Sequence, residues 1–568
     1  VWSVTLTGDY AGQYYTYLVT NAYYTEQEIV DPYAKSCGVD GLRGMIVDFS
    51  KTNPTGWEDF SSALPIDRKS EVVYETHVAD VTSSSTWGGS AANAKKFLGL
   101  TETGTTYSKD GTTVTTGFDH IKELGVNAVQ LLPIFDQAND EVNPSFNWGY
   151  NPLNYNCLEG AYSSNPYDGY ARIKEFKQVV QAYHEAGINI IMDVVYNHVN
   201  SVSNQNFDVL VPYYYFRYTS AGALSNGSGC GNETASNRIM FRNFMIDSTA
   251  FWLKEYKLGG FRFDLMGLHD IDTMNAVVAN LQTINAKVTV YGEPWTGGTS
   301  TLNTTQQAIQ VNGNKWVGFG GFNDHLRDPL IMGGMSGATD TGFVTKTTGK
   351  ISNTQMGYLL NGIKGITSTS AVGLTIADPD KTTNYVTCHD NYTLADRFAA
   401  TKLTYTAAQI EEMNVLANAV VLTSQGTSFM LAGEEFLRSK GGNSNSYNAS
   451  YAVNELNYAL KIAHPQMMSN YQKLISLKKN LDGLHLDKTG IASLTPSASA
   501  DNSEITYTLN DTANARTYKV VHASGYGAAP AVDLAGYTLY LDTLNSGVSL
   551  SAATAIAPYQ TLIAYKAA

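Results

Sequence analysis

Short apolar segments alternate with amphipathic helical segments over most of this chain, from about residue 71 to residue 477. Helical stretches such as 170–186 and 247–256 lie between several of the apolar runs. This alternation is typical of βα units and therefore of a parallel sheet. The candidate strands are 126–132, 188–194, 260–264, 288–292, 385–388 and 429–432.

The length of this region favours a closed barrel over an open sheet. Repeated βα units over about 400 residues exceed a plain (β/α)8 barrel of about 250 residues but fit a barrel with long insertions. The alternative, a doubly wound sheet, lacks a glycine-rich nucleotide fingerprint after its first strand. Residues 199–242 are irregular and rich in Gly and Asn around 225–232. We therefore expect an α/β (β/α)8 TIM barrel with an inserted loop region after strand 3.

Two β-rich segments flank the predicted barrel. Residues 1–50 contain short apolar and aromatic runs and predict a partial N-terminal β-sandwich-type module. Residues 51–70, which contain two prolines, are typical of a linker. The barrel then extends over 71–480 with its insertion at about 199–242, and alternating runs in 481–568 predict a C-terminal antiparallel β-sandwich.

The composition bears on the class of ligand. Only 15% of the 568 residues are charged, where about 25% is typical, while tyrosine alone numbers 37. A neutral polar surface of this kind suits hydroxyl-rich ligands such as sugars, and a secreted surface without any ligand fits equally well. The net charge of −14 argues against nucleic acid as a partner. No apolar run approaches the length of a membrane span.

The number and spacing of the cysteines do not indicate the cellular compartment of the protein. Four are present, at positions 37, 157, 230 and 388, and they allow three fully paired connectivities. No CxxC spacing indicates zinc. The sequence begins at Val1 without an initiator Met or a basic and apolar leader. We expect an extracellular or cell-surface protein whose signal peptide lies outside this sequence.

Four segments place polar residues at the ends of predicted strands, where a buried parallel strand rarely tolerates them. The segments are DVVYNH (193–198), GFRFDLM (260–266), YGEPW (291–295) and TCHDN (387–391). In a (β/α)8 barrel the carboxyl ends of the strands converge on one pocket. One carboxylate comes from each segment, so we expect a cluster of Asp193, Asp264, Glu293 and Asp390.

Such a cluster is expected in a glycoside hydrolase. The reaction needs one carboxylic acid and one nucleophile or base around a positively charged transition state. Arg262 and Asp264 are two residues apart and point to the same side of a strand. The guanidinium can therefore keep Asp264 ionised as a nucleophile. Glu293, with less compensation, is the natural general acid.

Each motif has an ordinary alternative. A single aspartate after a strand is more often an N-cap or a loop hydrogen-bonder, so the assignment depends on all four segments together. His198 and His389, taken alone, are more often core or loop histidines, but both adjoin candidate carboxylate segments and can donate to sugar hydroxyls. They are not expected to bind metal, because the sequence has no HExxH motif or compact histidine cluster.

In this order and spacing, the four segments resemble the motif regions of the α-amylase superfamily, glycoside hydrolase family 13. FNWGYNP (146–152) is similar to the YNWGYDP signature of type I pullulanases, with Phe146 for Tyr and Asn151 for Asp. The resemblance covers roughly residues 31–457. It implies Asp264 as nucleophile, Glu293 as acid/base and Asp390 as transition-state stabiliser, with Asp193 orienting Arg262 rather than acting as a catalyst. It also implies a set of substrate-binding residues: Tyr150 under the sugar in subsite −1, with Trp148, His198, Arg262, Trp295, His389 and Asn391 around it.

The expected activity is retaining hydrolysis of α-1,6 branch linkages in pullulan, amylopectin and limit dextrins. The alternatives are an amylopullulanase that also cuts α-1,4 bonds, an isoamylase-like debrancher, a glucanotransferase, or a non-catalytic glucan-binding protein. The expected partner is an α-glucan, with no nucleic acid and no membrane span. The resemblance implies that the N-terminal module is the later half of a starch-binding-type sandwich that packs against the barrel.

No cofactor is required for this chemistry, since carboxylates supply both the nucleophile and the proton transfer. A structural Ca²⁺ is common in the superfamily. Loops around Asn197 and residues 136–141 offer suitable hard oxygen ligands. The sequence does not place the metal ligands.

Overall fold

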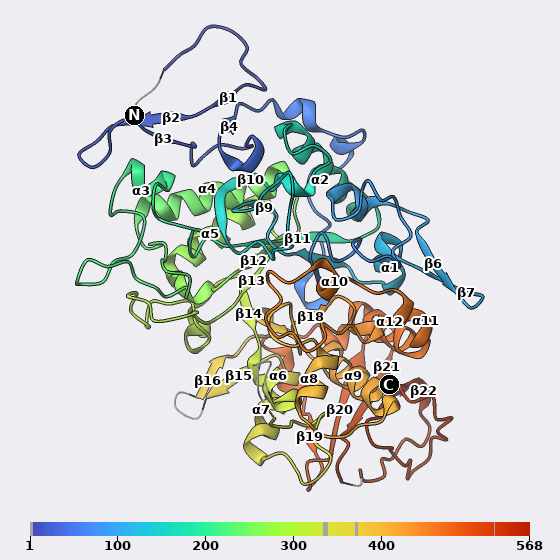
Figure 1. The fold of residues 1–568 in the computed structure, drawn as a ribbon. Coiled ribbons are helices and arrows are strands. Elements are labelled where there is room, and N and C mark those ends of the chain that lie inside the picture. The colour runs from blue at the N-terminus through green and yellow to red at the C-terminus, as the bar shows by residue number, and fades with distance from the viewer. Residues whose placement is uncertain (1–3, 333–338, 370–372, 528) are drawn as a thin grey trace.

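The computed structural model describes residues 4–332, 339–369, 373–527 and 529–568. Eight parallel strands form a closed barrel in which sequence order is also the order around the barrel. This confirms the predicted fold class, and Figure 1 shows the helices packed around the barrel. The barrel strands are β5 (Val72–Thr76), β8 (Ala128–Leu131), β11 (Asn189–Val194), β12 (Gly260–Phe263), β13 (Thr289–Gly292), β14 (Gly320–Phe322), β17 (Thr382–Asn384) and β18 (Thr427–Leu431).

The strands are buried on both faces, which explains why they are continuous apolar runs rather than alternating ones. In β11, every residue is buried. Ile191 belongs to the cluster that fills the barrel interior, whereas Ile190 and Met192 pack outward in the cluster that the helices cover. This is the two-residue period of a strand. The barrel interior is filled by Val73, Ala128, Ile191, Tyr291, Phe322, Tyr385 and Phe429.

The longer helices lie outside the barrel, and short ones occupy the connections. In α2, the Asp168 side chain accepts a hydrogen bond from the backbone of Tyr170 and so caps the first turn. Within the described residues, no helix is both long and apolar enough to cross a membrane. The helices are α1 (Gly117–Leu124), α2 (Gly169–Glu185), α3 (Asn206–Leu210), α4 (Ile239–Glu255), α5 (Ile271–Ile284), α6 (Asp324–Ile331), α7 (Asn353–Ile363), α8 (Leu394–Ala400), α9 (Ala407–Leu422), α10 (Tyr451–Asn454), α11 (Ala459–Ala463) and α12 (Pro465–Asn480).

The predicted strands match the barrel strands except at 385–388. There the prediction was wrong, because β17 ends at Asn384 and the next four residues form no ladder. Tyr385 and Val386 are apolar because they are buried beyond the last paired residue. β5 and β14 were not predicted from the sequence, and α4 begins at Ile239, eight residues before the predicted helix. The insertion follows the third barrel strand, as predicted.

The N-terminal segment consists of small antiparallel sheets. β1 (Tyr14–Tyr15) pairs with β4 (Gly44–Met45), and β2 (Tyr17–Val19) pairs with β3 (Gln27–Ile29). A disulfide between Cys37 and Cys157 ties this segment to β10 (Pro152–Leu158), which pairs with β9 (Phe135–Gln137). The segment therefore packs on the barrel domain, and Figure 1 shows its strands next to β10 and α4.

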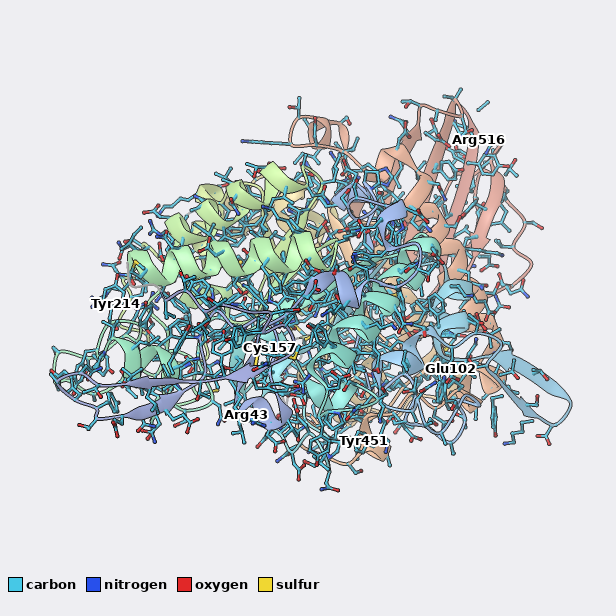
Figure 2. All side chains as sticks on the ribbon, turned by 90° about the horizontal axis from the view of Figure 1, so that it is seen from above. Arg43, Glu102, Cys157, Tyr214, Tyr451 and Arg516 are labelled. Atoms are coloured by element: carbon cyan, nitrogen blue, oxygen red, sulfur yellow. A yellow bond between two sulfur atoms is a disulfide. The ribbon has the colours of Figure 1, made fainter. Side chains whose placement is uncertain are left out.

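The C-terminal unit is a five-stranded antiparallel sheet in the order β19-β20-β21-β23-β22. Tyr507 donates a hydrogen bond to the backbone carbonyl of Thr423, which follows α9, so one face of the sheet packs on the barrel helices. Arg516 begins β21, the central strand, and lies at the outer end of the strands (Figure 2). The strands are β19 (Ser497–Ala498), β20 (Glu504–Asp511), β21 (Arg516–Ala523), β22 (Thr538–Asp542) and β23 (Thr561–Ala567). The remaining hairpins are β6 (Thr106–Lys109) with β7 (Thr112–Thr115), and β15 (Thr367–Thr369) with β16 (Gly373–Ile376).

Candidate active site

A cavity of about 560 Å³ lies at the carboxyl end of the barrel strands. The insertion contributes Asn200 and Cys230 to its wall, so part of this loop region lies at the carboxyl face of the barrel. Two predicted site residues, Arg262 and Asn391, do not line the cavity. The predicted residues that do line it are Trp148, Tyr150, His198, Asp264, Glu293, Trp295, His389 and Asp390.

The Arg262 guanidinium joins three carboxylates beneath this cavity. Its Nη1 contacts Asp264 Oδ1 at 2.9 Å and Asp193 Oδ1 at 3.2 Å, and its Nη2 contacts Glu293 Oε1 at 2.7 Å. The strand register explains the meeting, because Arg262 in β12 lies opposite Asp193 in β11 and opposite Tyr291 in β13. A single buried cation therefore compensates the negative charge of both predicted catalytic carboxylates.

Asp264 directly follows β12 and is held from two sides. Arg262 binds one carboxylate oxygen, and Asn197 Nδ2 donates to the other at 2.7 Å. Asn197 also donates to the backbone carbonyl of Asp264 at 2.8 Å. Because both oxygens have fixed donors, the carboxylate keeps one orientation toward the cavity.

Glu293 directly follows β13, and its two oxygens are also held. Arg262 binds Oε1, and the backbone N–H of Leu265 donates to Oε2 at 2.9 Å. Leu265 reaches this position with a left-handed backbone, φ 38°. Burial raises the pKa of Glu293, Arg262 opposes the rise, and the Asp264 and Asp390 carboxylates add to it. The net rise favours the protonated acid, which is the form that a general acid must have.

His389, which also lines the cavity, provides a second cation near the carboxylates. His389 Nδ1 lies 2.8 Å from Glu75 Oε1, and His389 Nε2 lies 3.7 Å from Asp390 Oδ2. Burial lowers the pKa of His389, but the Glu75 and Asp390 carboxylates more than offset this and raise it to about 9. The imidazole is therefore charged at neutral pH. The Asp390 side chain remains 45% exposed and accessible from the cavity.

Two aromatic rings pack around His389. The Tyr150 ring stacks on the imidazole at 5.0 Å and 16°, and the Trp148 ring meets it edge-on at 4.8 Å. Tyr150 also donates its hydroxyl to Asp193 Oδ2 at 2.8 Å. His198 Nε2 lies 3.0 Å from the backbone carbonyl of Tyr150, and burial lowers the pKa of His198. Residues 148–150 are thus fixed in place by the hydrogen bond from Tyr150 to Asp193, beneath the cavity.

Asp193 and Asn391 were predicted near the site but do not line the cavity. Asp193 is fully buried beneath the cavity, so the expected cluster of four carboxylates has only three at the cavity surface. Burial raises the pKa of Asp193 to about 7 against the opposing effect of Arg262. It contacts Arg262 and Tyr150, the geometry that its predicted orienting role requires. Asn391 has a left-handed backbone, φ 65°, just beyond the cavity wall.

Glu75 and Gln130, which lie under the site in β5 and β8, were not predicted from the sequence. Glu75 ends the apolar run VVYE, the same signal that identified the other strand-end carboxylates. The cavity wall also includes Asn147, from the FNWGYNP segment, and residues from loops that carried no motif: Asn200, Cys230, Asn445 and Tyr447.

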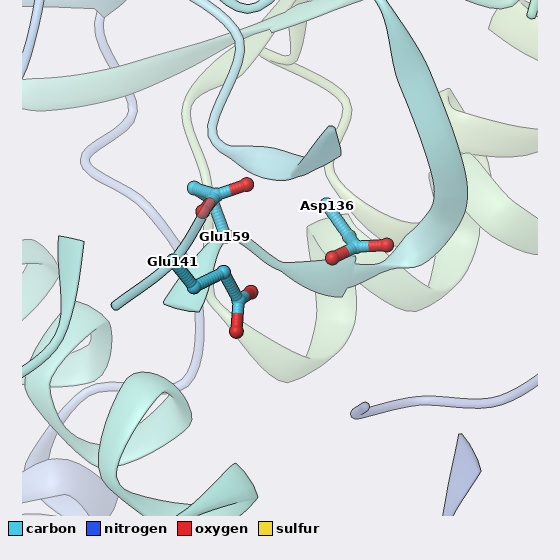
Figure 3. A group of neighbouring side chains, drawn as sticks. All are labelled: Asp136, Glu141 and Glu159. Atoms are coloured by element: carbon cyan, nitrogen blue, oxygen red, sulfur yellow. The ribbon is translucent and has the colours of Figure 1, made fainter. Parts of the chain in front are cut away.

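A second group of carboxylates lies away from the cavity, near β9 and β10 (Figure 3). The buried side chains of Asp136, Glu141 and Glu159 bring oxygen atoms within 4.8 Å of one another. Arg172 pairs with Glu141 at 2.9 Å. Asp136 Oδ1 has no hydrogen-bond partner among the described residues. Burial and the neighbouring Glu141 raise the pKa of Asp136, as expected when carboxylates share a site without enough positive charge.

These three residues fit a hard cation, because all their donors are oxygen atoms and one of them is unpaired. The region 136–141, one of the two predicted for Ca²⁺, contributes Asp136 and Glu141 to this group. Asn197, in the other predicted region, has both side-chain polar atoms engaged in the active site, with Asp264 and His198.

Comparison with known proteins agrees with this geometry. The family model "Alpha amylase, catalytic domain" matches residues 49–213. The chain is 36% identical to the pullulanase of Bacillus subtilis (strain 168), over 84% of this chain and 65% of that protein. It is 27% identical to the pullulanase of Klebsiella pneumoniae, over 84% of this chain and 54% of that protein. The chain thus spans between about half and two thirds of the length of these relatives.

Solved structures match over the whole chain. The pullulanase from Paenibacillus barengoltzii, in complex with maltohexaose and α-cyclodextrin, has a TM-score of 0.91 and 36% identity, covering 100% of this chain and 88% of that one. The pullulanase from Bacillus acidopullulyticus has a TM-score of 0.89 and 37% identity, covering 99% and 68%. The chain belongs to the pullulanase group of the α-amylase family of glycoside hydrolases.

Proposed function

We propose that this chain hydrolyses α-1,6-glucosidic branch linkages in pullulan, amylopectin and limit dextrins, with retention of the anomeric configuration. The observation that carries the proposal is the Arg262 guanidinium, which contacts Asp264 at 2.9 Å and Glu293 at 2.7 Å. Retaining glycosidases hold their two carboxyl groups about 5 to 5.5 Å apart, and a shared guanidinium keeps two carboxylates at short range. The pullulanases described above support the choice of linkage.

In the first step, Asp264 attacks the anomeric carbon while Glu293 gives its proton to the glycosidic oxygen. The bond to the leaving chain breaks, and a covalent β-glucosyl enzyme forms. In the second step, the ionised Glu293 takes a proton from water, whose oxygen attacks the anomeric carbon and releases Asp264. Two inversions give an α product. The raised pKa of Glu293 supplies the proton for the first step.

The remaining residues of the site bind the sugar and stabilise the transition state. Asp390 faces the cavity and stabilises the positive charge of the oxocarbenium-like transition state. The charged His389 donates to sugar hydroxyls, and Tyr150 provides the ring under the sugar in subsite −1. Trp148 and Trp295 also line the cavity and would bound the sugar.

Digestion of pullulan tests the proposal directly. Maltotriose as the only product means α-1,6 cleavage, whereas panose or isopanose means α-1,4 cleavage and products of altered branching mean glucan transfer. Proton NMR of the first product formed should show the α anomer. Replacement of Asp264 by Asn should abolish turnover while the circular dichroism spectrum stays native. Near-normal hydrolysis by this variant would refute the assignment of the nucleophile.

We propose further that Asp136, Glu141 and Glu159 hold a structural Ca²⁺. Three carboxylates with one paired arginine leave a buried excess of negative charge, which a hard divalent cation would neutralise. The ion would join β9 to the segment after β10 and so stabilise the region that carries the Cys37–Cys157 disulfide. It takes no part in the chemistry proposed above.

We also propose an extracellular or cell-surface location. The Cys37–Cys157 disulfide supports it, because structural disulfides persist in oxidising compartments. Pullulan and amylopectin are neutral polymers, and the low charge of the chain suits contact with them.

A further inference from the structure

Glu75 is a fully buried carboxylate at the carboxyl end of β5, directly behind the cavity wall. Its Oε1 lies 2.8 Å from His389 Nδ1, and its Oε2 accepts from the backbone N–H of His389 at 2.6 Å. The two oxygens thus hold the ring and the main chain of one residue. This pairing leaves His389 Nε2 as the ring nitrogen on the side of Asp390, at 3.7 Å from its carboxylate.

Gln130, in β8, connects Glu75 to the other side of the site. Its Nε2 lies 3.1 Å from Glu75 Oε1 and 3.4 Å from Asp193 Oδ2. Its Oε1 accepts the Tyr291 hydroxyl at 2.6 Å, which fixes the amide orientation and directs the NH₂ group toward both carboxylates. Glu75 with His389 and Asp193 with Arg262 are therefore two ion pairs connected by one amide.

We propose that Glu75 is a positioning residue for the hydrolysis proposed above, which it serves by fixing the His389 ring with Nδ1–H inward and Nε2–H toward the sugar. The inference rests on the proposed function for its kinetic consequence only. The contact between Glu75 and His389 can be tested without any turnover.

The charges around His389 come from several elements. Glu75 (β5) and Asp390 are the nearby carboxylates, Arg262 (β12) is a cation, and Lys440 Nζ donates to the His389 backbone carbonyl at 3.1 Å. Tyr150 stacks on the ring. Burial and Arg262 disfavour the charged imidazole, and the carboxylates more than offset them. Removal of the Glu75 charge should therefore lower the pKa of His389 and discharge the ring at a lower pH.

The first variant is Glu75→Gln, which preserves side-chain size. In the wild type, three donors face the two Glu75 oxygens: His389 Nδ1, the His389 backbone N–H and Gln130 Nε2. A glutamine offers one oxygen and places an NH₂ group against the remaining donors, so the ring must rotate or lose its Nδ1 proton. Glu75→Asp retains the charge on a shorter side chain and should restore part of the lost activity.

Glu434→Gln is the matched control. Glu434 lies after β18, is buried like Glu75, and accepts from Thr387 and Asn418 rather than from a cavity residue. Burial raises the pKa of Glu434 to about 8, so this variant reports the general effect of placing an amide where a buried carboxyl group stood at the barrel end, with little loss of charge at neutral pH. For all variants, kcat and KM on pullulan are measured across pH, with thermal unfolding as the check of folding.

We expect kcat/KM of Glu75→Gln to fall about ten- to a hundredfold, the range typical of residues that orient a functional side chain. Its alkaline limit of activity should move to lower pH, and Glu75→Asp should recover at least part of both properties. Glu434→Gln should retain the wild-type pH profile. The proposal is overturned if Glu75→Gln matches Glu434→Gln in kcat/KM and in pH profile, or if Glu75→Asp is no better than Glu75→Gln.

A second readout separates this inference from the proposed function. Nitrogen-15 histidine spectra of the full chain, with His389 assigned by its absence in His389→Asn, give the ring pKa directly. Glu75→Gln should lower that pKa by at least one unit, while Glu434→Gln should leave it unchanged. An unchanged His389 pKa in Glu75→Gln overturns the inference even if pullulan is cleaved, and a lowered one supports it even if the substrate proves to be another glucan.

Discussion

Asn197 donates two hydrogen bonds to Asp264, one to the carboxylate at 2.7 Å and one to the backbone carbonyl at 2.8 Å. Its own oxygen lies 2.6 Å from His198 Nδ1. The amide thus connects the third barrel strand region to the proposed nucleophile on the fourth. The carboxylate depends on this contact and on Arg262 for its orientation.

The first prediction concerns Asn197→Ala. Removal of the amide leaves one oxygen of Asp264 without its donor, so the nucleophile is less well aligned and kcat on pullulan should fall about ten- to a hundredfold. KM should change less, because Asn197 is not among the residues that line the cavity. Asn418→Ala, at an equally buried asparagine that bonds to Glu434 and Tyr471, is the control and should affect stability with kcat near the wild-type value. Equal kcat losses in both variants would contradict the orienting role.

The second prediction concerns pH. Glu293 must be protonated for the first step, and burial raises its pKa, with Asp390 among the groups that raise it further. Activity should therefore persist above the pH at which an ordinary glutamate ionises and should fall as the pH rises through the raised pKa. In Asp390→Asn, one contribution to the rise is removed, so the residual activity should fall at a lower pH than in the wild type. Profiles of kcat/KM against pH measure both limits, and a shift to higher pH in the variant would contradict this account.

The third prediction concerns the acidic group of Asp136, Glu141 and Glu159. Calcium should raise the melting temperature of the wild type, and chelation should lower it. A ligand at about one hundred times its Kd stabilises by about 2.7 kcal/mol. Asp136→Asn should lose this response and should not be less stable than the metal-free wild type, since one repelling charge is gone. Asp511→Asn, at a buried aspartate in β20, is the control and should respond to calcium like the wild type.

The barrel and the cluster of candidate catalytic carboxylates could be predicted because their signals are local. Asp264 and Glu293 each end an apolar run, and the topology of a (β/α)8 barrel brings such ends together. Asp390 was found in the same way, although its strand was placed too late in the sequence. The contacts that orient these groups have no local signal. The pairing of Glu75 with His389 joins residues 314 positions apart and depends on the closure of the barrel between β18 and β5.

The same reasoning explains one misplaced strand, β17, and one strand that was not predicted, β14. Tyr385 and Val386 are buried like strand residues, so their apolar character could not reveal that the ladder ends at Asn384. β14 is only three residues long and begins Gly-Gly, a composition that sequence patterns associate with turns. Cys37–Cys157 was one of several possible pairings, and only the packing of the N-terminal segment against β10 selects it.

The fourth prediction concerns that disulfide. It closes a sequence separation of 120 residues, and removal of such a crosslink typically costs about 2 to 4 kcal/mol. The double variant Cys37→Ser with Cys157→Ser should therefore melt at a lower temperature while its pullulan products stay the same. The Cys230→Ser variant, at a free cysteine, should have the melting temperature of the wild type. A double variant as stable as Cys230→Ser would show that the crosslink contributes little.

The last prediction uses Cys230 as a reporter of the cavity. This free, exposed thiol lies in the insertion and lines the same cavity as Asp264. Although the residue is exposed, partial burial of its thiol and the Asp264 carboxylate raise its pKa, so its alkylation by a maleimide should be slow at neutral pH and faster as the pH rises. A bulky adduct at this position narrows the cavity and should block pullulan hydrolysis, and maltotetraose present during alkylation should slow the loss of activity.

The Cys230→Ala variant should resist the reagent. Because Cys388 is largely buried with a pKa raised well above its ordinary value, it should react far more slowly. Inactivation of Cys230→Ala at the wild-type rate would show that the reagent acts elsewhere, and loss of activity without protection by maltotetraose would place Cys230 outside the path of the glucan.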